Sequence, residues 1–303
     1  MAAVLSWLVI APAHSQSWKP EAPVRLVVGF AAGGTTDAVA RALASELTKE
    51  LGQQVIVDNR AGAGGAIAVA EMLRSPPDGR VLQLAGSELF LTKDGREGLV
   101  PAALVATSPL VLVSRPELTL DSLKKGSRTR LYAPGYQARL VAGQLGLPGR
   151  SYVDLSGGPR ALQDALGNEV DAALLPYAAV KPEIEAGKLK VIASSKDSGF
   201  PALASSPSFE VKTPEITSNF LGVFAPPGTR PELVRSISAA VEKSLRQPQV
   251  VERLRTAGVT PKLGDAESLA RLIQVQYGVT PDVCKKKETC EADKDCSRPC
   301  PTS

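Results

Sequence analysis

The chain has 303 residues, of which 44% are apolar and 22% are charged, and its formal net charge is +4. This length and composition are typical of a soluble protein with one large core or two medium ones. Basic residues are spread along the chain and are not interleaved with aromatic ones. We therefore expect no nucleic-acid partner, and the small positive charge suits an acidic ligand.

The first residues resemble a secretory signal. An apolar run from Ala2 to Ala13 precedes the small-residue pattern Ala13-His14-Ser15, which predicts a signal peptide over residues 1–15 with cleavage before Gln16. The run is too short to span a bilayer, which takes about 20 apolar residues. We expect an exported, periplasmic protein. His14 is the only histidine, so the mature chain would have no Ser-His-Asp or Cys-His site, and we predict no catalytic activity.

Strands and helices alternate in the first hundred residues. Apolar runs predict buried strands at residues 24–29, 55–57 and 81–85. Between them, a repeat of 3.6 residues predicts a helix with Thr36 or Asp37 as its cap and Gly52 as its stop, and then a second helix over residues 66–74. This order predicts parallel strands joined by right-handed crossovers.

The same alternation continues to about residue 276. Strands are predicted at residues 104–114, 171–175, 189–194 and 220–225, and helices at 137–145, 232–246, 248–257 and 266–276. The pattern predicts an α/β protein of two lobes, with lobe 1 formed by residues 19–107 and 222–283 and lobe 2 by residues 108–221. The turns that follow the strands are expected to point into a cleft between the lobes.

Two glycine-rich turns connect strands to helices. The first contains Gly33, Gly34, Thr35 and Thr36, and the second contains Gly62, Gly64 and Gly65. Such turns gather unpaired backbone N–H groups at the positive end of a helix dipole, which favours an anion. Two of them on adjacent parallel strands would converge on one carboxylate. The alternative is a pair of ordinary tight turns, in which glycine serves backbone geometry alone.

Other anion-binding motifs fit less well. A nucleotide-triphosphate loop needs a lysine at the helix start, where this chain has Gly34-Thr35-Thr36. A dinucleotide fold needs the spacing Gly-x-Gly-x-x-Gly; Asp58 suits that fold but the glycines do not, so a dinucleotide-dependent oxidoreductase stays an alternative. Asp37 is predicted to brace the first turn by accepting backbone N–H bonds.

The four cysteines all lie near the C-terminus, at Cys284, Cys290, Cys296 and Cys300. Their spacing is not the paired Cys-x-x-Cys of a zinc site, so we expect no metal. In an oxidising compartment two disulfides are expected, with three connectivities open, in a cysteine-rich tail over residues 284–303.

Several segments in order resemble the Bug-type receptors, the periplasmic solute-binding proteins of tripartite tricarboxylate transporters. These are PVRLVVGFAAGGTTDAVARALASEL, DNRAGAGGAIAVAE, PPDGRVLQL, GGPRALQDALGNEVDAAL and FLGVFAPPGTRPELV. The resemblance covers roughly residues 20–280 and implies a type II-like periplasmic-binding-protein fold, with two parallel or mixed sheets flanked by helices. It implies a monomer without a cofactor that captures a small carboxylate and presents it to membrane components of such a transporter or to a sensor.

The resemblance also assigns ligand contacts. In lobe 1 they are Phe30, Ala31, Gly33, Gly34, Thr35, Thr36, Gly64, Gly65 and Ser87, and in lobe 2 they are Gly135, Tyr136, Gln137, Gly157 and Gly158. The sequence departs from the family pattern at Gly29 and Ala31, where proline is usual, and at Arg139, where histidine is usual. The remaining alternative is therefore a diverged interaction protein that no longer binds a ligand.

Overall fold

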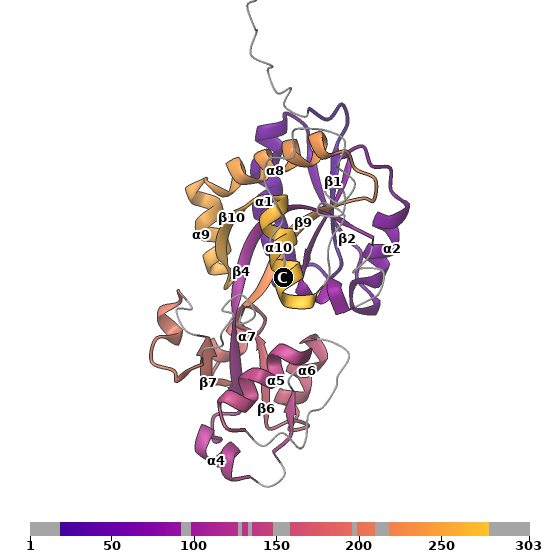
Figure 1. Ribbon diagram of the computed structural model, residues 1–303. Helices are drawn as coiled ribbons and strands as arrows, with labels where there is room; N and C mark the ends of the chain where they lie inside the picture. The colour runs from indigo at the N-terminus through magenta and orange to yellow at the C-terminus, as the bar shows by residue number, and fades with distance from the viewer. Residues whose placement is uncertain are drawn as a thin grey trace, which may run out of the picture.

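The computed structural model describes residues 19–91, 98–126, 129–132, 135–147, 158–195, 199–209 and 218–278. The predicted signal peptide and the four cysteines lie outside these residues. Two groups of elements, one above the other in Figure 1, are joined by a long strand, β4 (Val100–Ser114). The structure is a mixed α/β fold with helices flanking a sheet.

The first group begins with three parallel strands, as predicted. β1 (Val24–Val28) pairs with β2 (Val55–Asn59) on one side and with β3 (Val81–Gly86) on the other, both in parallel. The helices α1 (Thr35–Leu51) and α2 (Ala66–Arg74) connect them. α1 ends at Gly52, which has a left-handed φ of 63° as a glycine C-cap requires.

Helices cover both faces of this part of the sheet (Figure 1). Alternate strand residues point to opposite faces. Leu26 and Leu84 join the core beneath α1, α8 (Pro231–Leu245) and α9 (Pro248–Thr256). Val27 and Ala85 join a separate core beneath α2 and α10 (Ala266–Tyr277).

β4 carries the chain from the first group to the second. It pairs antiparallel with β9 (Ser218–Ala225) from Val100 to Pro109, and with β6 (Ala172–Pro176) and β7 (Lys190–Ser195) from Leu110 onward. β10 (Thr260–Gly264) adds an antiparallel edge to β4. The change of partner between Pro109 and Leu110 lies close to the predicted lobe boundary, and the division of the chain into lobes stays a prediction.

The second group has a small mixed sheet. β5 (Leu131–Tyr132) pairs in parallel with β6, β8 (Ser208–Phe209) pairs in parallel with β7, and β4 runs antiparallel to both β6 and β7. The helices are α4 (Leu120–Lys125), α5 (Gly135–Gln144), α6 (Gly158–Leu166) and α7 (Tyr177–Glu185). Short 3₁₀ turns lie at Ala63–Gly65, Ser87–Leu91 and Pro201–Leu203.

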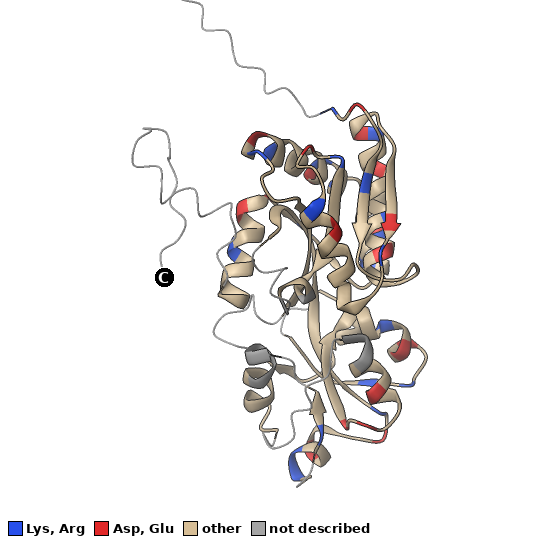
Figure 2. Ribbon diagram, turned by 90° about the vertical axis from the view of Figure 1, so that its right-hand side faces the viewer, with Lys and Arg blue, Asp and Glu red and all other residues tan. Residues whose placement is uncertain are grey.

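Charged residues of both signs are interspersed over the described helices and strands (Figure 2). Many form local ion pairs, such as Arg246 with Glu242 at 2.6 Å and Lys181 with Glu185 at 2.8 Å. In the part of the chain that the structure describes, no helix is both long and apolar enough to cross a bilayer. No cluster of metal-ligating side chains was found among the same residues.

Candidate functional site

The turn between β1 and α1 presents the start of a helix to solvent. Residues 31–34 are exposed, and Gly33 has a left-handed φ of 90°. Gly34 is the N-cap, and no side chain in the described residues caps the helix there. The sequence placed this cap at Thr36 or Asp37, which was wrong: the extended backbone of Gly34 caps the helix two or three residues earlier, and α1 begins at Thr35. The first-turn amides have no partner within the helix, as in any helix, and can bind an anion.

Asp37, in the first helical turn of α1, stabilises the segment between β1 and α1 by hydrogen bonding. Its carboxylate accepts hydrogen bonds from the backbone N–H of Gly33 at 3.0 Å and from Arg41 Nε at 2.9 Å. Burial favours the neutral acid, but the bonds from Arg41 and Gly33 outweigh burial and hold the pKa of Asp37 below its ordinary value. The N–H of Gly33 is therefore occupied by Asp37, and the N–H groups of Gly34, Thr35 and Thr36 are the candidates left for binding an anion.

We expect Asp37→Asn to lower the free energy of unfolding by about 1–3 kcal/mol near pH 7, since a charge-assisted bond is lost. Because the folded pKa lies below the unfolded value of about 3.9, the wild-type advantage is complete above about pH 5. It is lost as pH falls through the folded pKa. Urea unfolding of both proteins between pH 2.5 and 7 measures this difference.

The control for that experiment is Asp78→Asn, which removes an exposed carboxylate whose partner is Arg80 two residues away. Exposed pairs contribute about 0–1 kcal/mol, so its effect should be smaller. A gap between wild type and Asp37→Asn that stays constant down to pH 2.5 would contradict the role given to the ionised Asp37.

Asn59, at the end of β2, also holds the first turn. Its side-chain amide donates to the carbonyl of Phe30 at 3.0 Å, and its oxygen accepts from Arg41 at 3.4 Å. Sequence analysis did not single out Asn59. Its place directly after a buried strand and beside the second glycine turn is the signal that could have indicated it.

The second turn lies directly against the first. Gly62, Gly64 and Gly65 have φ values of 141°, 64° and 97°, which only glycine adopts easily. A Cβ placed on Gly29 would lie 3.0 Å from the Cα of Gly65, so the two backbones touch. Gly65 is the N-cap of α2, again without a side-chain cap among the described residues. The N-terminus of α2 therefore lies against the residue that follows β1, in the turn that leads to α1.

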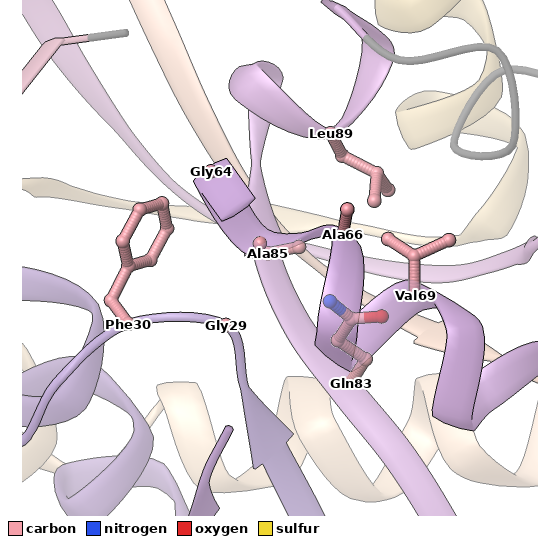
Figure 3. Close-up of a pocket in the computed structure, with 9 residues that line it drawn as sticks. Gly29, Phe30, Gly64, Ala66, Val69, Gln83, Ala85 and Leu89 are labelled. Atoms are coloured by element: carbon pink, nitrogen blue, oxygen red, sulfur yellow. The ribbon is translucent and has the colours of Figure 1, made fainter. Parts of the chain in front are cut away.

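A small pocket opens where the two turns meet (Figure 3). Its walls come from both turns, from α2 and from β3, and its lining residues are Gly29, Phe30, Gly64, Gly65, Ala66, Val69, Gln83, Ala85 and Leu89. Phe30, Gly64 and Gly65 were predicted site residues. Ser87 is buried and lies outside this lining; its N–H donates to Asn219 Oδ1 at 3.3 Å.

Thr35 connects the first turn to the second group of elements. Its hydroxyl donates to the carbonyl of Ala178 in α7 at 3.1 Å. The N–H of Ala178 in turn donates to Ser108 Oγ at 3.0 Å, and that hydroxyl donates to the carbonyl of Gly258 at 3.2 Å. The side chain of Thr35 is thus engaged by α7, and its backbone N–H is the group left for a ligand.

The predicted contacts of lobe 2 are described only in part. Gly135, Tyr136 and Gln137 form the start of α5, and Gly158 is the first residue of α6. The side chains of these positions, and Gly157 as a whole, lie outside the described residues. Ligand contact stays a prediction for every site residue in both lobes.

One long strand shared by two α/β groups is typical of a two-lobed periplasmic binding protein. The chain belongs to the tripartite tricarboxylate transporter family receptors, whose model matches residues 39–126 and 136–288. It is 33% identical to Protein BugT of Bordetella pertussis, over 84% of this chain and 85% of that protein.

Solved structures agree with this membership. The periplasmic binding protein BugD matches with a TM-score of 0.68 and 26% identity, over 89% of this chain and 98% of BugD. MatC of Rhodopseudomonas palustris, solved with bound malate, matches with a TM-score of 0.68 and 27% identity, over 86% of this chain and 97% of MatC. The predicted family and fold class are therefore confirmed.

Proposed function

We propose that this protein is an exported solute-binding receptor that captures a small carboxylate between its two lobes and has no catalytic activity. The observation that carries the proposal is the backbone contact between Gly29 and Gly65, which brings the turn after β1 and the N-terminus of α2 together. Family membership and the malate bound to MatC support the ligand class.

The ligand's charge is met mainly by main-chain groups. The first-turn amides of α1 and α2 donate hydrogen bonds, and both helix dipoles present their positive ends to the carboxylate. Asp37 keeps Gly33 in place, so the donors are fixed before the ligand arrives and little ordering is needed on binding. The starts of α5 and α6 supply the contacts of the second lobe.

A membrane partner would recognise the closed conformation, in which the two lobes surround the ligand. Binding proteins of two lobes move by a hinge, and the segment of β4 around Ser108 and Pro109 is where one sheet passes into the other. We propose that the closed monomer acts in the periplasm and docks on the membrane components of a tripartite tricarboxylate transporter or on a sensor.

Isothermal titration calorimetry with malate, succinate and NAD⁺ tests the proposal. Saturable binding of one acid per chain, with no binding of NAD⁺, is the expected result. Mass spectrometry of small molecules released on denaturation provides a second measurement, and we expect a carboxylate among them. Binding of NAD⁺ in place of the acids would favour the oxidoreductase alternative, and binding of none would favour a diverged interaction protein.

A further inference from the structure

Gln83 is a polar residue in the middle of an apolar sheet. It lies on β3 opposite Val27 of β1 and Phe224 of β9, and it is 1% exposed. Val27 and Phe224 belong to the apolar core beneath α2 and α10. The side-chain amide extends from β3 toward Ala66 and Val69 of α2 (Figure 3).

The carbonyl oxygen of this amide has no hydrogen-bond partner among the described residues. A buried acceptor without a donor is unfavourable, and an apolar side chain of similar size would be more stable at the same place. Fold stability therefore does not explain a glutamine here. The unpaired Oε1 of Gln83 therefore points to a hydrogen-bond donor from another molecule, such as a ligand or a water.

The side chain that carries this oxygen lines the pocket between the two glycine turns. Gln83 is the one polar side chain among the nine described residues that line it, and Gly64, Gly65 and Ala66 bring the N-terminus of α2 to the same pocket. The cavity volume is about 10 Å³, which is close to the space of one water molecule. A hydroxyl group has this size.

We propose that Gln83 is a specificity-determining residue at the base of the carboxylate site, where its Oε1 accepts a hydrogen bond from one hydroxyl-sized donor. The donor is the hydroxyl of a bound hydroxycarboxylate or a single water molecule beneath the ligand. The inference rests on the proposed function. The helix N-termini attract the ligand's negative charge, whereas Gln83 Oε1 selects for a hydrogen-bond donor next to that charge.

Malate and succinate differ by one hydroxyl group, so the pair of acids tests the proposal. Calorimetry compares wild type with Gln83→Met, which keeps the side-chain length and removes the acceptor. The control is Leu84→Met, since Leu84 is the next residue on β3 and packs in the core on the opposite face. Thermal unfolding of all three proteins checks the fold, and we expect no loss of stability in Gln83→Met.

If the ligand supplies the donor, wild type binds malate about tenfold more tightly than succinate, and Gln83→Met removes this preference. If a water supplies it, wild type binds both acids alike, and Gln83→Met weakens both by about tenfold. Wild-type affinities for both acids in Gln83→Met would overturn the inference and leave the proposed function standing. Failure of wild type to bind either acid would overturn both.

Discussion

Replacing Gly34 with leucine is expected to lower the affinity for a carboxylate by at least about 100-fold. Gly34 has a φ of −80°, which any residue adopts, and a Cβ there would lie 3.8 Å from its nearest neighbour, the carbonyl oxygen of Ala31. The side chain thus fits the fold but occupies the exposed space beside the first-turn amides of α1. Losing two charge-assisted hydrogen bonds, each contributing about 1.5–3 kcal/mol, corresponds to about 10²–10⁴ in affinity.

Calorimetry with malate measures the loss, and thermal unfolding checks the fold. Leucine is a poorer N-cap than glycine, so a cost of about 1 kcal/mol in stability is expected. The matched control is Gly143→Leu, on an exposed position of α5 where a Cβ meets no atom of the described residues within 4 Å; it should bind malate as wild type does. Wild-type affinity in Gly34→Leu would place the ligand away from this turn.

The local features of the first lobe were predictable from sequence because neighbouring residues determine them. The apolar run in β1 and the helical repeat after it need no distant partner, and the glycine C-cap Gly52 marks the end of α1. β10 was not predicted from the sequence, because its residues alternate too little in polarity. It pairs with β4 only as an irregular edge strand.

Contacts between distant segments could not be predicted in this way. Thr35 was assigned to the ligand, but its hydroxyl bonds Ala178, 143 residues away in sequence. Gln83 was included in a predicted strand and was not considered as a site residue, because only the sheet order shows that its position is central and buried.

The contact between α7 and the turn after α9 depends on a close backbone approach at Gly258, and Gly258→Ala is expected to be strongly destabilising. A Cβ at Gly258 would lie 2.9 Å from the Cα of Ala178, and a backbone atom cannot rotate away as a side chain does. The left-handed φ of 79° adds about 1–2 kcal/mol for a residue other than glycine. With about 1–3 kcal/mol for the overpacking, the free energy of unfolding should fall by about 2–5 kcal/mol.

Gly187→Ala separates the two causes. Gly187 follows α7 with a φ of 71°, close to that of Gly258, but a Cβ there meets no atom within 4 Å among the residues that the structure describes, so only the conformational cost of about 1–2 kcal/mol applies. The shift in urea midpoint, compared between the two variants, therefore measures the cost of pushing α7 away from Gly258. Ala178 also accepts the hydrogen bond from Thr35. Pushing α7 away from Gly258 would therefore also move α7 away from the first glycine turn. We expect Gly258→Ala to bind malate more weakly than Gly187→Ala. Equal stability of the two variants would show that the lobes separate at this point without cost.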